Sequence, residues 1–101
     1  MTANQNELVW LQEWYLNQCN GDWEHQWGIS VETLDNPGWT LSIDLRGTNL
    51  EGKIFQDLNI ERTAFDWVNC RIEKQTFKGA GGPRNLPELI AVFRRWAENA
   101  A

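Results

Sequence analysis

The sequence predicts a single α+β domain, in which one antiparallel sheet packs against two helices and the elements follow in the order α-β-β-β-β-α. Apolar residues recur at helical spacing near both ends of the chain and alternate with polar residues between them. The chain has 101 residues, 42% of them hydrophobic, which suffices for one core and for no second domain. We therefore expect residues 1–101 to form one unit, with both helices on one face of the sheet.

The first helix is expected from about residue 5 to residue 19. Asn4 precedes Glu7 by three residues, which is the spacing of a capping box. Gly21 suits the left-handed conformation that often ends a helix. Steps of three and four residues predict one core-facing side for this helix, formed by Leu8, Leu11, Tyr15 and Cys19.

A β-hairpin is expected next, with strands at residues 29–33 and 39–45 in which apolar and polar residues alternate. Between them, Pro37 and Gly38 occupy the two central positions of a type II turn, so we expect Gly38 to need a positive φ. Two weaker strands should follow around residues 54–60 and 68–72. The glycine-rich stretch after them is expected to be a flexible connection.

The closing helix is expected to begin near Asn85, which stands three residues before Glu88 in a second capping-box spacing. Pro87 falls in the first turn of this helix, where a missing backbone N–H is harmless. The apolar stripe of the helix contains Leu86, Leu89, Ile90, Phe93, Trp96 and Ala97.

Charge is distributed unevenly along the chain. Residues 1–45 hold seven acids and no Lys or Arg, whereas residues 46–101 hold seven acids and nine bases, for a net charge of −5. An acidic field repels nucleic acid and anionic lipid and attracts a basic partner, so we expect neither nucleic acid nor a membrane as partner. A solvated surface kept for solubility is the alternative. Seven Trp residues exceed what one small core hides, which favours a binding surface.

The two cysteines, Cys19 and Cys70, are too few for a disulfide framework. Both lie on apolar stripes, so we expect reduced, buried, structural thiols. With one His and no C-x-x-C pair, no metal site is expected. The beginning of the chain lacks a basic segment followed by an apolar one, and the longest apolar run covers residues 89–93. A cytoplasmic location is therefore expected.

Two segments could carry chemistry. Asp22, Glu24 and His25 lie close together in the sequence and could support acid–base catalysis, but adjacent residues in a turn point in different directions. The loop from Gly79 to Pro83 could cradle a phosphate, but it matches no phosphate-binding motif. We expect no catalytic site and no cofactor. A small enzyme or ligand-binding protein built on these two segments is the alternative to a protein-binding module.

Distinctive strings stand along nearly the whole chain: WY at 14–15, QCNGDWEH at 18–25, GI at 28–29, TLDNPGW at 33–39, IDL at 43–45, DW at 66–67, Cys70 and FKGAGGP at 77–83. Together they resemble the immunity protein 53 family, from about residue 8 to residue 96. Asn20 departs from the Asp expected there in the family. The resemblance implies a bacterial immunity protein of a polymorphic toxin system, which binds a cognate toxin in the cytoplasm and is not an enzyme.

The acidic half is expected to carry the toxin-binding surface, because an acidic inhibitor suits a basic toxin and many toxins that attack nucleic acid are basic. Glu32 and Asp44 alternate with core positions and should project from the open face of the sheet. Trp23 is expected to be an aromatic anchor beside them. The candidate toxin-binding residues are Asp22, Trp23, Glu24, His25, Glu32, Asp35 and Asp44.

Overall fold

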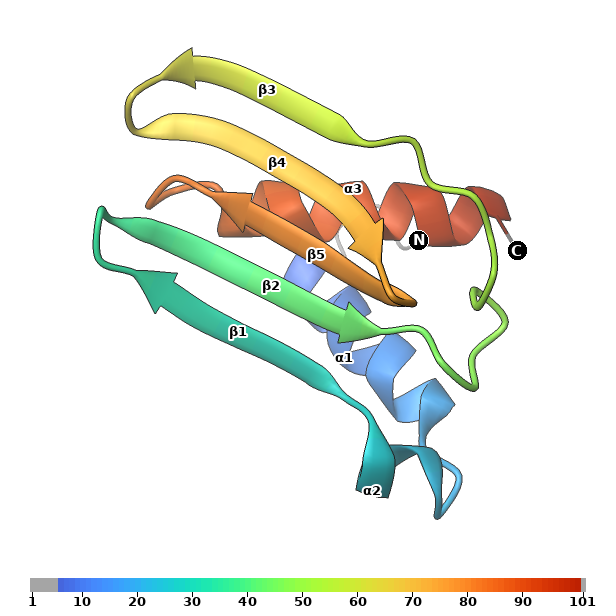
Figure 1. Ribbon diagram of the computed structural model, residues 1–101. Coiled ribbons are helices and arrows are strands. Elements are labelled where there is room, and N and C mark those ends of the chain that lie inside the picture. The colour runs from blue at the N-terminus through green and yellow to red at the C-terminus, as the bar shows by residue number, and fades with distance from the viewer. Residues whose placement is uncertain (1–5, 101) are drawn as a thin grey trace.

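A computed structural model describes residues 6–100 of the chain, which form three helices and one antiparallel sheet of five strands (Figure 1). The order of strands in the sheet is β1-β2-β5-β4-β3, so β1 and β3 are its two edges. The elements are α1 (Glu7–Gln18), α2 (Trp23–Gln26), β1 (Ile29–Leu34), β2 (Gly38–Asp44), β3 (Leu58–Thr63), β4 (Asp66–Glu73), β5 (Thr76–Gly81) and α3 (Leu86–Ala100).

Both long helices, α1 and α3, lie on one face of the sheet, and no helix of residues 6–100 covers the other face (Figure 1). The predicted α+β class, antiparallel sheet and two packed helices are confirmed. The predicted number of strands is wrong, since the sheet has five, and the short helix α2 is an addition. Within the described residues, no helix combines the length and apolar character that a membrane span requires.

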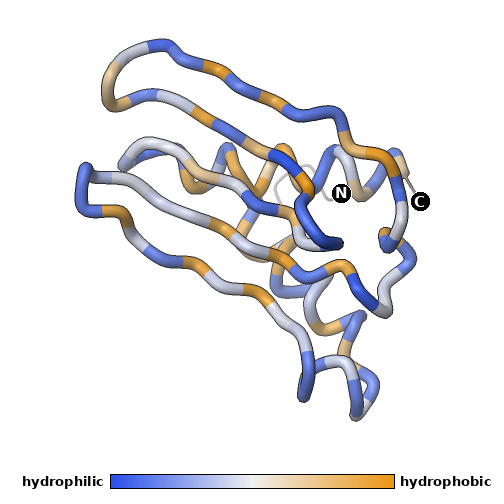
Figure 2. The backbone as a smooth tube through the Cα atoms, viewed as in Figure 1, coloured by the Kyte–Doolittle hydropathy of each residue, from blue (hydrophilic) through white to orange (hydrophobic). Residues whose placement is uncertain are grey.

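The β1–β2 hairpin is confirmed, and hydrophobic positions along β1 alternate with hydrophilic ones (Figure 2). The reason given for Gly38 is wrong, because its φ is not positive. Gly38 instead begins β2 opposite Leu34, and a Cβ at this position would collide with the backbone O of Gly81. Close approach of two strands, rather than turn conformation, therefore requires glycine here.

The expected flexible connection after residue 77 is the largest error of the sequence interpretation, because Thr76–Gly81 is the central strand β5. Gly79 and Gly81 are buried on the helix-facing side of this strand. A Cβ at Gly79 would lie 3.3 Å from Leu89 of α3, and one at Gly81 would lie 3.0 Å from the Cβ of Asn85. These glycines let α3 approach the sheet closely.

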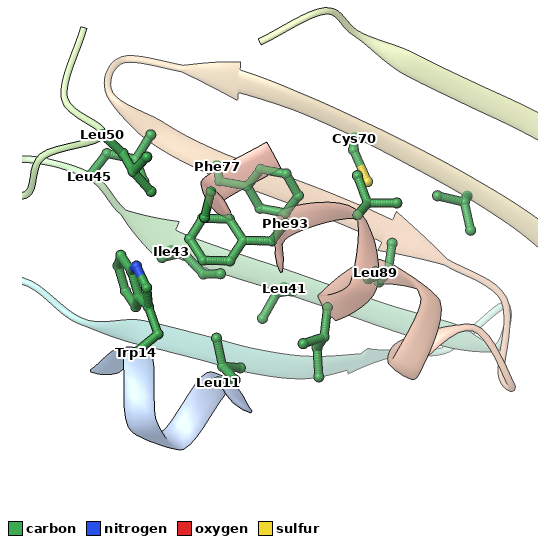
Figure 3. Close-up of a cluster of buried hydrophobic side chains, with 14 of the residues drawn as sticks. Leu11, Trp14, Leu41, Ile43, Leu45, Leu50, Cys70, Phe77, Leu89 and Phe93 are labelled. Atoms are coloured by element: carbon green, nitrogen blue, oxygen red, sulfur yellow. The ribbon is translucent and has the colours of Figure 1, made fainter. Parts of the chain in front are cut away.

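The core lies between the sheet and the two long helices. Phe93 of α3 occupies its centre, with ring centroids 5.1 Å from both Trp14 of α1 and Phe77 of β5 (Figure 3). The fully buried aliphatic residues come from β2, β4, α3 and the loop after β2, and include Leu41, Ile43, Leu45, Leu50, Val68 and Leu89. One continuous cluster therefore joins every layer of the fold.

Helix α1 packs through a different side from the one predicted. Its N-cap is Asn6, whose Oδ1 accepts a hydrogen bond from the backbone N–H of Val9 at 2.8 Å, and the expected cap Asn4 lies outside the described residues. Leu11 and Trp14 are buried, whereas Leu8 is 61% exposed. The large indole rings of α1 dominate its packing on α3, and they leave a second apolar stripe uncovered.

Candidate functional site

Residues 20–26 form a compact, hydrogen-bonded turn at one end of the sheet. The carboxylate of Glu24 accepts hydrogen bonds from the backbone N–H groups of Asn20 at 2.9 Å and Gly21 at 2.8 Å. The pKa of Glu24 lies below its usual range, because its own backbone N–H and those two N–H groups stabilise the charged form, with a smaller contribution from His25. Glu24 therefore stabilises the turn itself.

Trp23 lies in the core and not on a surface. Its side chain is 3% exposed, and its Nε1–H donates to the backbone O of Arg46 at 2.8 Å. Its ring packs edge-on against Trp14 and Tyr15. The expectation that Trp23 anchors a partner fails for this reason: the indole N–H is satisfied internally and the ring is inaccessible.

The other indole N–H groups explain much of the tryptophan surplus. Trp39 donates to the backbone O of Pro83 at 2.9 Å, and Trp96 donates to the backbone O of Ile54 at 2.8 Å. Like Trp23, each ring joins a helix or strand to a loop that is distant in the sequence. Tryptophan therefore serves here to fasten loops onto the core, and no Trp of the described residues is fully exposed.

Glu32 and Asp44 both lie on the open face, because Glu32 pairs with Thr40 and Asp44 stands an even number of residues further along β2. Glu32 is exposed. Asp44 is engaged: its carboxylate lies 3.4 Å from a guanidinium nitrogen of Arg46 and also accepts the backbone N–H of Arg46 at 3.1 Å. Of the two expected acidic residues, Glu32 is therefore exposed to solvent, whereas the Asp44 carboxylate is held by Arg46.

The predicted acidic residues border β1 and do not gather in one patch. Asp22 lies at the α2 end of β1 and Asp35 lies in the turn at its other end (Figure 1). Glu32 stands between them on β1 itself. A strand of this length spans about 20 Å, so the acids form a line along one edge of the sheet.

A groove lies between α1 and the beginning of β1. The sequence interpretation missed it, because it assigned Leu8, Leu11 and Tyr15 to the core-facing side of the helix. The groove has a volume of about 440 Å³. Leu8 and Tyr15 of α1 remain 61% and 39% exposed there. The groove is lined by Leu8, Leu11, Gln12, Tyr15, Trp27, Gly28 and Ile29. The signal that could have found it is the double apolar stripe of α1, which is too wide for a single contact with one helix.

The two segments of the alternative interpretation do not meet. The segment that contains Asp22 and His25 lies at the end of the sheet where Asp44 pairs with Thr76, whereas Gly81 pairs with Trp39 near the opposite end. Five steps along β5 separate these pairs by about 16 Å. The acid–base residues and the candidate phosphate-binding segment therefore lie apart, and the segment Gly79–Pro83 packs against α3.

Neither thiol lies in a reactive or metal-binding setting. Cys70 is 1% exposed, and burial, with a smaller contribution from Glu88, raises the pKa of its thiol to about 12. Cys19 is only half-buried, contrary to the prediction, and its Sγ–H donates to the backbone O of Tyr15 at 3.3 Å. Across residues 6–100, no three His, Cys, Asp or Glu side chains are grouped as a metal site requires.

The immunity protein 53 family model matches residues 8–98, which is nearly the whole chain. The chain belongs to the immunity protein 53 family. No curated protein and no solved structure matches it. Membership of this family indicates a toxin-neutralising immunity function and therefore a toxin as partner, and immunity proteins are generally not enzymes.

For a member of the immunity protein 53 family, the residues of interest are those that a toxin can reach. Asp22, His25, Glu32 and Asp35 are exposed, whereas Trp23 is buried. Glu24 and Asp44 are partly buried and hold their own loops through the hydrogen bonds described above. Four of the seven predicted residues are therefore available at the surface, and these four lie on β1 or beside its two ends.

Proposed function

We propose that this immunity protein acts in the cytoplasm and neutralises its toxin by direct binding. We further propose that the toxin is a basic nuclease of a polymorphic toxin system. Membership of the immunity protein 53 family supports toxin neutralisation. The charge distribution supports a basic toxin, because residues 1–45 contain seven acids and no Lys or Arg. Complementary fields speed encounter between two proteins and suppress association with wrong partners.

The proposed contact surface is the β1 side of the molecule, centred on Asp22, Glu32 and Asp35. These three carboxylates are exposed and border one strand. The bases of the open face lie further across the sheet, where Lys78 of β5 pairs with Arg71 of β4. Beyond β2 this face carries charges of both signs, since Arg71 lies 3.4 Å from Glu73. The strand β1 carries Glu32 and no base, so a basic toxin is attracted to the β1 side.

Charge reversal at the two edges of the sheet tests this surface. We expect the double variant Glu32→Lys/Asp35→Lys to fold, because exposed charges contribute little to stability. At low salt, this variant should associate about tenfold more slowly than the parent chain with the toxin encoded beside its gene. The matched control is Asp57→Lys/Glu61→Lys, which makes the same change in net charge on exposed residues in and just before β3. Thermal melts establish folding of both variants.

Survival of cells that produce the toxin provides the functional measurement. The parent chain and the β3-side control should protect, and the β1-side variant should protect less. Equal protection by both folded variants would contradict the acidic surface. Failure of the parent chain to bind or protect against that toxin would contradict the proposed function itself.

A further inference from the structure

The free edge of β1 presents unpaired backbone groups. The backbone N–H of Asp44 donates to the O of Gly28, which makes Gly28 and Asp44 a hydrogen-bonded pair of the antiparallel ladder. Such pairs alternate with pairs whose N–H and C=O groups point away from the partner strand. The outward-pointing groups of β1 are therefore those of Ile29, Val31 and Thr33.

This edge lacks most of the features that block pairing with another strand, and its one charged side chain is Glu32. Edge strands in proteins are protected by lysines, prolines, bulges or a covering element. The sequence of β1, ISVETL, contains no Lys and no Pro, and it pairs with β2 in continuous register without a bulge. Residues 30–33 are exposed. β1 therefore offers six residues in continuous register to a further strand.

The groove beneath β1 offers sites for apolar side chains of such a strand. Ile29 and Val31 point toward the helix-facing side, where Val31 is 43% exposed and Ile29 lines the groove. Leu8 and Tyr15 form its other wall on α1. On the opposite side of the same strand, Glu32 faces the open side and is exposed. An added strand therefore meets an apolar surface on one side and a carboxylate on the other.

We propose that an extended segment of the cognate toxin adds to β1 as a sixth strand of the sheet. Alternate side chains of this segment are apolar and enter the α1–β1 groove, and those between them are Lys or Arg and face Glu32. Backbone hydrogen bonds to Ile29, Val31 and Thr33 supply affinity, and the alternation of apolar and basic residues supplies selectivity. This inference rests on the proposed function and specifies its binding mode.

Charge complementarity favours the toxin over a second copy of this chain as the occupant. Each copy carries a net charge of −5, and its first 45 residues contain no Lys or Arg. Pairing of two β1 edges would bring two acidic borders together, and like charges across paired strands are destabilising. A basic strand instead neutralises Glu32 and the neighbouring Asp22 and Asp35.

Proline substitution at outward-pointing positions tests the strand pairing. Val31→Pro removes an outward N–H without removing a hydrogen bond to β2, which edge strands tolerate. The matched control is Asn59→Pro on β3. The backbone N–H of Gly82 donates to the O of Trp67, and the same alternation then leaves the N–H of Asn59 pointing outward from the other edge. We expect Val31→Pro to weaken binding of the toxin domain encoded beside the gene by at least about tenfold and Asn59→Pro to leave it unchanged.

A second pair of variants tests the groove without touching a strand. Leu8 and Leu16 of α1 are both 61% exposed, but only Leu8 lines the groove. Leu8→Asn should weaken toxin binding several-fold, whereas Leu16→Asn should not. Circular dichroism and thermal melts establish that all four variants fold, and isothermal titration calorimetry measures their affinities.

The outcomes separate this inference from the proposed function. If the parent chain binds the toxin and neither Val31→Pro nor Leu8→Asn weakens binding more than its control, the added strand is wrong and toxin neutralisation stands. If the parent chain self-associates in sedimentation experiments and Val31→Pro abolishes only that self-association, the occupant is a second copy and the inference is overturned. If the parent chain does not bind the toxin, both proposals fail.

Discussion

The two edges of the sheet are built in opposite ways. At β3 the pairing with β4 shifts register between Glu61 and Thr63, and Arg62 holds Asp66 at 2.9 Å and Glu88 at 2.7 Å. At β1 the register is continuous, and no ion pair within the described residues crosses the edge strand. A bulge and fixed charges close an edge to further pairing, so the molecule protects β3 and leaves β1 open.

The closed edge is also fastened to helix α3. The side-chain amide of Asn85 donates to Asp66 and to Glu88, each at 3.0 Å, and Asn85 is buried. The pKa of Asp66 is lowered chiefly by Asn85 and then by Arg62, and the pKa of Glu88 chiefly by Arg62. Asn85 and Glu88, the two residues of the predicted capping box, therefore contact each other through their side chains. Together with Asp66 they form a clamp that joins the β3–β4 end of the sheet to α3. Side-chain hydrogen bonds and ion pairs hold one edge, whereas the other edge is accessible.

The largest loss of stability is expected from a substitution that disturbs the contact between the β1–β2 hairpin and β5. Gly38→Ala should lower the free energy of unfolding by about 2–4 kcal/mol, because the added Cβ collides with the backbone O of Gly81. Gly28→Ala is the matched control at the beginning of the same hairpin, where a Cβ meets nothing within 4 Å. Urea titrations of both variants measure the difference. Equal stability of the two would show that β2 and β5 do not approach as described.

A smaller loss is expected at the closed edge. Asn85→Ala should lower the free energy of unfolding by about 1–3 kcal/mol, because it removes the hydrogen bonds to Asp66 and Glu88 and leaves their carboxylates without this donor. Asn59→Ala, at an exposed position on β3, is the control and should change little. The same urea titrations apply. A neutral Asn85→Ala would mean that the clamp does not stabilise this end of the sheet.

Acid should weaken the closed edge. The folded-state pKa values of Asp66 and Glu88 lie below their ordinary values, so the stabilisation is present above those ordinary values and is lost as pH falls through the lowered ones. We expect the melting temperature to fall as pH decreases from about 5 to about 2, and to fall less steeply in Glu88→Gln than in the parent chain. Asn59→Ala, which changes no titratable group, should retain the parental slope. Identical slopes for Glu88→Gln and the parent would contradict the clamp.

The smallest effect is a difference in thiol reactivity and does not involve stability. Cys70 should react very slowly with a thiol reagent at pH 7, because burial suppresses its thiolate, whereas half-buried Cys19 should react faster. The variants Cys19→Ser and Cys70→Ser assign the two rates. Fast modification of Cys70 in the native protein would show that the sheet opens beneath β3 and β4.

The sequence predicted those parts of the fold in which the spacing of apolar and polar side chains reflects which of them are buried. Alternation located β1 and β2, and helical spacing located both long helices. The alternation of apolar and polar residues did not predict β5, because its glycines carry no side chain that could show such an alternation. The turn before β5 was also invisible, since Lys74 and Gln75 adopt the positive φ values usual for Asn and Gly.

The candidate site was only partly predictable for a related reason. Charge counting found the acidic half, but it could not tell that Glu24 and Asp44 hold their own loops or that Trp23 is buried. Those distinctions depend on tertiary neighbours. The groove was missed because Leu8 and Tyr15 were assigned to the core-facing side of the helix, whereas both side chains stay exposed.

The most direct test of an open β1 edge is residue-resolved amide hydrogen exchange, measured on the free chain and on its complex with the toxin. In the free chain, the amides of Val31, Thr33 and Asn59 should all exchange rapidly, because each points outward from an edge. In the complex, Val31 and Thr33 should become protected while Asn59 stays unprotected. Protection of Asn59 with no change at Val31 and Thr33 would contradict pairing at β1 and place the toxin on the β3 edge.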